Sequence, residues 1–290
     1  MVINAEDIRR IHGKDERISL EQFQSMIESY TRLFQVGRLP NESEDVAPKA
    51  ELKTEHEDNH QADPSVESGE QNITSENIQF TFNAYNEDIV ITGAKNSGKS
   101  YLANTIVKSL NNITCFVWDF NHQFHDARSM LFNHLDEMLE VYDNQKKGRY
   151  ILQPFDKSKP MFEKFCNAIF ERGNIVAVFD ELHLMTSKQA ILKPFNNLIL
   201  SGRPRGVSVI SISTRPAQIP NAVLSNASHV FCFRLNIESD VKFLESWMGS
   251  EVWQLMPVDK RQKMQSAPTL PEHTFYYRNQ SEVNGVIGKV

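Results

Sequence analysis

From residue 78 to the C-terminus, the chain alternates short apolar runs with segments whose apolar residues recur every three or four positions. The runs predict buried strands, and the longer spacing predicts amphipathic helices. Expected strands are 78–82, 88–92, 113–120, 150–152, 174–179, 207–212 and 230–235. Expected helices are 101–110, 129–142, 160–172, 188–200 and 238–248, with a shorter one around Trp253. Because several strands are apolar on both faces, we predict an α/β fold class, with a mostly parallel central sheet flanked by helices. The tail, 275–277 and 283–287, predicts a hairpin at the sheet edge.

The first 76 residues follow a different pattern. Ser19 is an expected helix N-cap, with Gln22 three residues later as in a capping box, and apolar residues then recur at helical spacing as far as Phe34. We therefore expect a helical N-terminal extension over 1–40, whose helix either docks on a partner or packs on its own domain. Residues 41–76 contain eleven acids, two bases and few large apolar side chains, which predicts an acidic disordered linker before a domain at 77–290.

Residues 93–100, GAKNSGKS, match the phosphate-binding pattern G-x-x-x-x-G-K-[ST], and we call them the phosphate loop. A predicted strand precedes the loop and a predicted helix follows it, as the chemistry requires. Glycines let backbone N–H groups turn toward a phosphate, and the helix N-terminus adds partial positive charge. Lys99 is expected to reach the β- and γ-phosphates, and Ser100 to hold Mg²⁺. The predicted nucleotide-binding residues are Gly93, Ala94, Lys95, Asn96, Ser97, Gly98, Lys99, Ser100 and Tyr101.

The apolar run 174–179 ends in two carboxylates, Asp180 and Glu181. The carboxyl end of a central parallel strand lies beside the phosphate loop in open α/β sheets, so this is the Walker B pattern of a P-loop NTPase. Asp180 is expected in the Mg²⁺ shell, and Glu181 is expected to orient or deprotonate the attacking water. His183 is expected to have a structural role.

Polar residues also flank the next strand, 207–212. Thr214 follows it and is placed to contact the γ-phosphate or the attacking water. Arg203 and Arg205 precede it on a turn. Either arginine completes the active site of a neighbouring subunit, or both are solvated side chains, and spacing alone leaves the two interpretations equal.

Charge is unevenly distributed along the chain. The net charge is −6, but residues 1–76 carry 17 acids and 8 bases, a net of −9, so the remaining 20 acids and 23 bases give +3. A mildly basic domain permits phosphate contacts. The linker is therefore either a solvated tether or a competitor of DNA for that domain. A short basic cluster, Lys260, Arg261 and Lys263, either touches a phosphate backbone or is a solvated face.

The three cysteines are far apart and predict buried thiols in a reducing compartment. The sequence shows neither a signal peptide nor an apolar run of transmembrane length. We therefore expect a soluble intracellular protein without stable membrane insertion.

Four motifs in order, GAKNSGKS, VAVFDE, SGRPRGVSVISISTRP and NASHVFCF, resemble the FtsK/HerA superfamily of DNA-pumping ATPases. Within it, the chain is most similar to the genome-packaging ATPases of poxviruses, of related large DNA viruses and of tailless icosahedral viruses. The resemblance covers roughly 86–236. It implies a RecA-like (ASCE) P-loop domain. It also implies that Arg203 is the arginine supplied to the active site of a neighbouring subunit, with Arg205 as the second candidate for that role. Two residues depart from the family pattern: Thr214 stands where Gln is usual, and Pro204 where His is usual.

The resemblance implies a Mg²⁺-dependent ATPase that drives double-stranded DNA through a ring of identical subunits, a pentamer or a hexamer. The expected task is packaging a viral genome into a capsid. Capsid or portal vertex proteins are then possible partners, and the expected location is the host-cell cytoplasm or the virion. Two alternatives remain open. One is a cellular or plasmid DNA translocase of the same superfamily. The other is a filamentous-phage assembly or secretion ATPase that does not act on DNA.

Overall fold

The structure, a computed structural model, describes residues 70–75, 78–261, 263–280 and 285–290. The expected extension 1–40 and most of the expected linker lie outside these residues. Residues 70–75, which the sequence analysis assigned to the linker, form strand β1 (Glu70–Ser75) instead. Strand β1 pairs antiparallel with β2 (Ile78–Asn83). Hydrogen bonding to β2 explains why so polar a segment becomes a strand.

The main sheet has nine strands in the order β11-β10-β9-β3-β8-β7-β4-β6-β5. All neighbours from β9 to β5 are parallel, whereas β10 runs antiparallel to both β9 and β11. The mostly parallel sheet and the hairpin at its edge are therefore confirmed. The strands are β3 (Asp88–Thr92), β4 (Cys115–Trp118), β5 (Ser129–Phe132), β6 (Arg149–Leu152), β7 (Ile175–Phe179), β8 (Val207–Ser213), β9 (Ala227–Phe233), β10 (Thr274–Asn279) and β11 (Val286–Lys289).

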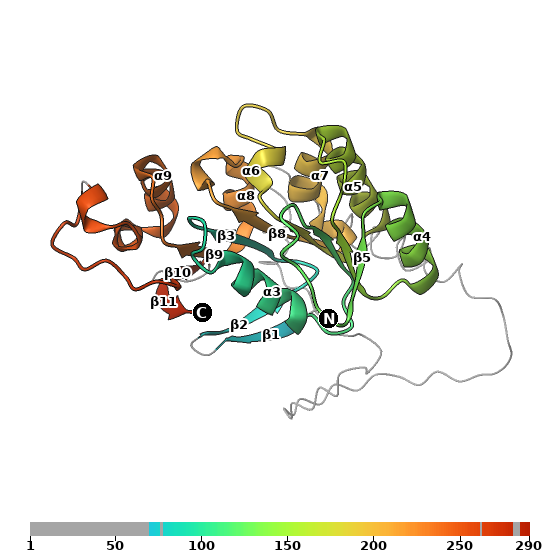
Figure 1. Ribbon diagram of the computed structural model, residues 1–290, viewed down its shortest axis with the longest axis horizontal. Helices are drawn as coiled ribbons and strands as arrows, with labels where there is room; N and C mark the ends of the chain where they lie inside the picture. The colour runs from blue at the N-terminus through green and yellow to red at the C-terminus, as the bar shows by residue number, and fades with distance from the viewer. Residues whose placement is uncertain (1–69, 76–77, 262, 281–284) are drawn as a thin grey trace, which may run out of the picture. The chain divides into compact units, whose positions relative to one another are not determined.

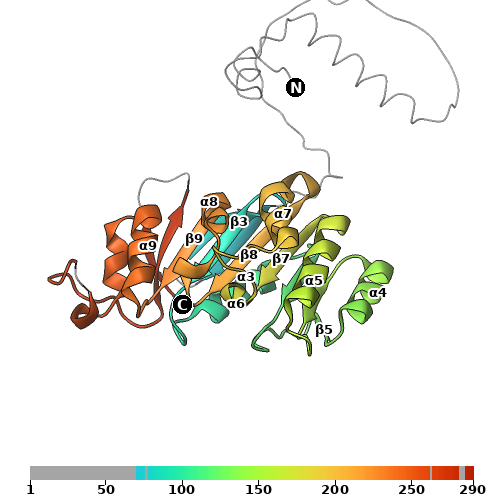
Figure 2. The ribbon, with the colours of Figure 1, turned by 90° about the horizontal axis from the view of Figure 1, so that it is seen from above.

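Helices cover the sheet on both faces, and two apolar clusters fill the layers. One cluster joins Ile89 and Ile91 to α3 and β2, while Val90, which points the other way, belongs to the cluster beneath α4, α5, α7, α8 and α9. Figure 1 shows α3 with the β1–β2 hairpin on one side of the sheet and α5 and α7 on the other. Figure 2, seen from above, shows α4, α5, α7, α8 and α9 over the strands.

The helices are α3 (Lys99–Ser109), α4 (Leu135–Gln145), α5 (Lys159–Arg172), α6 (Leu182–Met185), α7 (Lys193–Ser201), α8 (Asn221–Asn226) and α9 (Glu238–Met248). Four 3-10 turns accompany them, η1 (Arg203–Arg205), η2 (Pro216–Gln218), η3 (Ser250–Leu255) and η4 (Val258–Lys260).

Helix α5 shows how local sequence sets the ends of an element. Ser158 is its N-cap, and the Ser158 hydroxyl accepts the N–H of Met161. Pro160 lies in the first turn, where a missing N–H costs nothing, and Gly173 ends the helix with a φ of 66°. The expected helix 160–172 is confirmed.

Three expected elements have different bounds. The expected helix 129–142 is instead the strand β5 followed by α4, because Ser129–Phe132 pairs in parallel with β6 and extends the sheet. The helix expected at 188–200 begins only at Lys193, with Pro194 in its first turn. The strand expected at 113–120 is shorter, Cys115–Trp118.

Other expectations concern thiols and membranes. Cys115, Cys166 and Cys232 are buried and free, as predicted. Within the described ranges, the structure contains no helix that is both long and apolar enough to span a bilayer.

Candidate active site

The phosphate loop begins directly after β3 and ends where α3 starts. Its two glycines have positive φ, 149° at Gly93 and 111° at Gly98. A Cβ on Gly93 would lie 2.6 Å from the Cβ of Phe233, and one on Gly98 would lie 2.7 Å from Val290 Cγ2. Both the backbone conformation and the packing therefore require glycine. The loop is tied to the neighbouring strands, because Gly93 N–H donates to the Ser213 carbonyl and Ala94 N–H to that of Arg234.

Lys99 is buried in the turn of the loop, and its Nζ donates to the Ala94 carbonyl at 2.8 Å. Burial lowers the pKa of Lys99, whereas the charges of Glu181 and Asp180 raise it. Ser97 Oγ is also buried in the loop and has no hydrogen-bond partner among the described residues. A buried hydroxyl without a partner beside a buried cation fits a site that an anionic ligand completes.

Strand β7 ends at the two predicted acids. Asp180 is 2% exposed, and its carboxylate accepts the N–H of Asn121 at 3.2 Å. Burial, reinforced by the charges of Glu181 and Asp119, raises the pKa of Asp180 to about 7. Glu181 has a left-handed backbone, with φ 48° and ψ 45°, at the turn into α6. A non-glycine residue in this conformation is uncommon and marks a constrained position.

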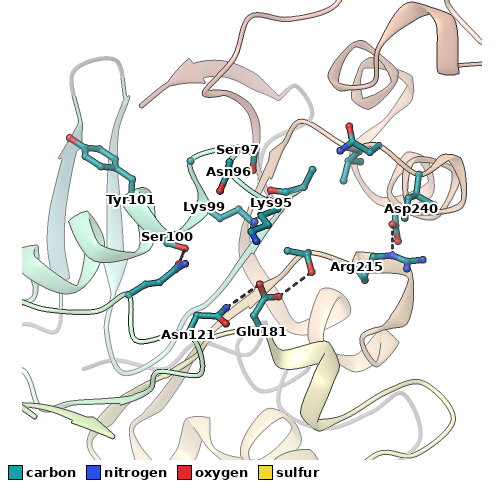
Figure 3. A pocket seen from close by; sticks show the side chains of 17 residues that line it. Lys95, Asn96, Ser97, Lys99, Ser100, Tyr101, Asn121, Glu181, Arg215 and Asp240 are labelled. Carbon is teal, nitrogen blue, oxygen red and sulfur yellow. Dashed lines mark hydrogen bonds and ion pairs between the residues drawn. The ribbon is translucent and has the colours of Figure 1, made fainter. Parts of the chain in front are cut away.

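Thr214 joins the two halves of the site. Strand β8 lies between β3 and β7, so the residues after β8 lie between the phosphate loop and the acids. The Thr214 hydroxyl donates to Glu181 Oε2 at 3.1 Å. On the other side of the same carboxylate, Asn121 Nδ2 donates to Oε1 at 3.4 Å. Figure 3 shows Glu181 held between these two contacts.

The loop and the strand ends enclose a cleft of about 730 Å³. All the predicted residues of 94–101 line it, together with Glu181 and Thr214. The Tyr101 ring is 66% exposed and points away from the other lining side chains in Figure 3. In the described part of the chain, the lining does not include Gly93, Asp180 or Arg203. Gly93 is hydrogen-bonded to the Ser213 carbonyl, and Asp180 is buried at the end of β7.

Two oxygen-bearing side chains, Ser100 in the cleft lining and the buried Asp180 at the end of β7, are of the kind that binds a magnesium ion. The Ser100 hydroxyl donates to Gln123 Oε1, and Asp180 is a buried carboxylate whose pKa is raised first by burial and then by the charges of Glu181 and Asp119. The described residues contain no cluster of three His, Cys, Asp or Glu side chains arranged for a metal. Magnesium commonly takes one or two protein oxygens and completes its shell with water and substrate phosphates. Ser100 and Asp180 match that pattern.

The two arginines of the 203–205 turn have different surroundings. Arg203, 41% exposed, donates to the Asn226 carbonyl and lies 3.9 Å from Asp88 Oδ2. It precedes β8, at the opposite end of that strand from Thr214. Arg205 donates to the carbonyls of Phe170 and Glu171 at the end of α5, and its guanidinium lies 4.8 Å from the Phe170 ring centroid. Both arginines are exposed, but Arg205 caps a helix with two of its nitrogens, whereas Arg203 donates to one carbonyl and is the better candidate for a contact outside its own chain.

The basic cluster near residue 260 is mostly engaged within the chain. Arg261 is buried and donates to the carbonyls of Trp253 and Ala267. Lys263 pairs with Glu245 at 2.8 Å. Two of the three cations of this cluster therefore have partners within the chain, which argues against the cluster as a surface for a phosphate backbone.

Sequence reasoning missed several lining residues. Asn121 and Gln123 follow β4, and the rule that parallel strands end at one edge would have found them. Arg215 directly follows Thr214, and its Nε donates to Asp240 Oδ2 at 2.9 Å. Asp240 had no sequence signal, because it lies in α9 and reaches the cleft only through the fold. The segment 235–237, after β9, completes the lining.

A phosphate loop after the first strand of the parallel core, acids two strands away and one strand inserted between them define the RecA-like fold of P-loop NTPases. Neither a protein-family model nor a curated protein sequence matches the chain.

Among solved structures, the chain is similar to the genome-packaging NTPase B204 of Sulfolobus turreted icosahedral virus 2. The complex with AMPPCP has a TM-score of 0.55 and 18% identity, over 70% of this chain and 97% of that chain. The complex with ATP-gammaS has the same TM-score, identity and coverage. B204 of Sulfolobus turreted icosahedral virus, described as a DNA-packaging ATPase, has a TM-score of 0.53 and 19% identity, again over 70% and 97%. These likenesses establish a shared fold and agree with the resemblance inferred from the motifs.

Proposed function

We propose that this chain is a Mg²⁺-dependent ATPase that moves double-stranded DNA, and that its task is to package a viral genome into a capsid. The observation that carries the ATPase proposal is the placement of Lys99 and Glu181 at one cleft, with Thr214 between them. The fold shared with B204, whose solved complexes contain AMPPCP and ATP-gammaS, supports ATP as the substrate. The description of B204 as a DNA-packaging ATPase supports DNA as the cargo.

In this mechanism the phosphates of ATP lie along the phosphate loop. Backbone N–H groups, the N-terminus of α3 and Lys99 face them, and the Ser97 hydroxyl gains its missing partner. Ser100 and Asp180 would hold Mg²⁺, which neutralises phosphate charge when bound. Glu181 aligns a water with the γ-phosphorus and accepts its proton as the bond to the leaving oxygen breaks.

The remaining charge is stabilised from outside the subunit. Arg203 of a neighbouring copy would reach the γ-phosphate, which is worth about 10³–10⁵ in rate in enzymes that use such an arginine. This step requires a ring of identical subunits, a pentamer or a hexamer, with nucleotide between them. Capsid or portal vertex proteins would be the partners at the packaging site, in the host cytoplasm or on the virion.

The first test is the steady-state ATPase rate with and without double-stranded DNA, at low and moderate salt. We expect DNA to stimulate the rate and salt to weaken the stimulation, because phosphate contacts release counterions. Lys99→Ala should abolish ATP binding or turnover. Glu181→Gln should bind ATP but lose about 10²–10⁴ in turnover.

Each contrary outcome affects a different part of the proposal. An ATPase rate indifferent to DNA would leave the nucleotide site in place but favour an assembly or secretion ATPase. Normal turnover by Glu181→Gln would remove the catalytic base. Stimulation by DNA without any effect of capsid or portal proteins would favour a cellular or plasmid translocase.

A further inference from the structure

The imidazole of His183 lies against the side of the cleft that holds the predicted base. His183 is in α6, two residues after Glu181, and its side chain is 10% exposed. Its Nδ1 is 3.3 Å from Ser213 Oγ and 3.4 Å from Glu181 Oε2, and its Nε2 is 3.3 Å from Thr214 Oγ1. Three polar side chains from two different strand ends therefore meet on one ring.

We propose that His183 is a positioning residue that orients the hydroxyl of Thr214 and, through it, the carboxylate of Glu181. This inference rests on the proposed function, in which Glu181 is the general base. It also gives Thr214 a role that its short side chain can perform. Thr214 holds the base in place, whereas the longer glutamine usual in related sequences has the reach to contact the γ-phosphate itself.

Counting donors and acceptors assigns a direction to this network. The hydroxyl of Thr214 has one hydrogen, and its shortest contact of the two is to Glu181 Oε2, at 3.1 Å against 3.3 Å to the ring. Thr214 Oγ1 must then accept from the ring, so Nε2 carries the proton. Nδ1 is left as an acceptor for the Ser213 hydroxyl, whose oxygen in turn accepts the N–H of Arg215 at 3.0 Å. In this arrangement the Arg215 N–H, the Ser213 and Thr214 hydroxyls and both ring nitrogens each have a partner, and the 3.4 Å approach of Nδ1 to Glu181 Oε2 is a contact without a hydrogen bond.

The surroundings of the ring favour the neutral form that this network needs. Burial lowers the pKa of His183, and the charges of Arg215 and Lys99 lower it as well, whereas those of Glu181 and Asp240 raise it. A neutral imidazole has one donor and one acceptor, and both are used here. A charged ring would donate at both nitrogens and would leave the Ser213 hydroxyl without its acceptor.

The position of the base makes such support necessary. Glu181 has a left-handed backbone, so its side chain leaves the strand end at an angle that the strand itself does not fix. Asn121 holds Oε1 at 3.4 Å and Thr214 holds Oε2. Without His183, the Thr214 hydroxyl loses the donor that fixes its rotation, so the Glu181 carboxylate is held less firmly in the orientation that activates water.

The test compares kcat and KM for ATP in the full chain and in His183→Ala, His183→Gln and Thr214→Val. His134→Gln is the matched control, because His134 lies before α4 and is exposed. We expect His183→Ala to lower kcat about 10- to 100-fold, because the hydrogen bond from Thr214 to the charged Glu181 carboxylate loses its orientation. KM should stay within about 2-fold, because a residue that does not touch nucleotide leaves ground-state binding unchanged. His183→Gln, which keeps a donor and an acceptor, should recover part of the loss.

A double-mutant cycle separates positioning from a purely structural role. Single-turnover rates are measured for Glu181→Gln with and without His183→Ala. If His183 acts through Glu181, removing it from the Glu181→Gln protein should change the rate by less than about 3-fold, because the two residues act as one unit. Thr214→Val should likewise be non-additive with His183→Ala.

Several results would overturn the proposal. They are a His183→Ala protein with wild-type kcat, a loss of kcat that is equally large in the Glu181→Gln background, or a loss that appears only in KM. If His183→Ala does not fold, His183→Gln and Thr214→Val decide the question by the same criteria. A wild-type chain without ATPase activity would instead reject the proposed function, so the two failures are distinguishable.

Discussion

At the scale of single residues, the turn 203–205 separates two arginines that the sequence presents as equivalent. The guanidinium of Arg205 is used within the chain, on the last carbonyls of α5 and the Phe170 ring. The guanidinium of Arg203 donates to one backbone carbonyl, lies 3.9 Å from the Asp88 carboxylate and is exposed. The same residue type therefore has a stabilising role at one position and is available for an intermolecular contact at the other.

This difference predicts opposite effects of two alanine substitutions. Arg205→Ala should lower the free energy of unfolding by about 1 kcal/mol, because helix-end carbonyls lose their donors, and should leave most of the ATPase activity. Arg203→Ala should fold and assemble normally but lose ATPase activity. Urea unfolding and steady-state turnover measured on both variants check this. A stable, inactive Arg205→Ala beside an active Arg203→Ala would exchange the two roles.

At the scale of elements, strand β3 runs from the end of the parallel strands where Arg203 lies to the end where the candidate active site lies. It begins at Asp88 and ends at Thr92, where the phosphate loop starts. Asp88 is buried, accepts the N–H of Val209 at 2.7 Å and lies near Arg203. Burial raises the pKa of Asp88 from an ordinary 3.8 to about 6, against the Val209 hydrogen bond and the charge of Arg203, which lower it.

The raised pKa of Asp88 predicts a pH dependence of stability. The folded chain binds this proton more tightly than the unfolded chain, so the contribution of Asp88 to the free energy of unfolding falls as pH rises from about 4 to about 6, by about 3 kcal/mol. In Asp88→Asn this fall should be absent, while other groups such as Asp180 contribute equally to both proteins. Unfolding free energies from pH 4 to 7 provide the comparison. Parallel curves for the two proteins would show that Asp88 does not titrate in this window.

Elements also show where a hydrophobic pattern is ambiguous. Residues 129–142 contain apolar side chains at helical spacing, yet the first four form strand β5 because the edge of β6 offers them hydrogen-bond partners. Glu70–Ser75 has almost no apolar pattern and still becomes β1, paired with β2. In contrast, α5 was predicted closely because Pro160 in its first turn and Gly173 at its end are local signals. Local signals are visible in sequence, whereas pairing with a distant edge is not.

At the scale of the whole molecule, the proposed assembly can be tested by mixing inactive subunits. If Arg203 acts on the neighbouring site, a ring containing Glu181→Gln and Arg203→Ala subunits has some complete interfaces, each with Glu181 from one subunit and Arg203 from the next. In an equimolar random ring these are about a quarter of all interfaces. We expect the mixture to regain ATPase activity that neither variant has alone. Turnover of the mixture after co-assembly measures this, with each variant mixed with Lys99→Ala as controls.

The controls follow from the same geometry. Lys99→Ala subunits carry an intact Arg203, so they should rescue Arg203→Ala, whose own site is otherwise complete. They also carry an intact Glu181, but a site without Lys99 cannot use it, so they should not rescue Glu181→Gln. A mixture that stays inactive with both partners would place Arg203 outside the neighbouring site or deny the ring.

The sequence alone determined those parts of the protein that depend on contiguous residues. The phosphate loop, the acids after an apolar run and the helix ends at Pro160 and Gly173 are of this kind, because turn conformation, helix termination and strand-end placement are set within a few positions. Tertiary structure decided that Arg205, and not Arg203, caps the end of α5 in its own chain. It also placed Asn121 and Asp240 at the cleft and grouped His183 with Ser213, Thr214 and Glu181. The physical reason is the order of the parallel sheet, which brings the ends of β4, β7, β8 and β9 to one edge although they are far apart along the chain.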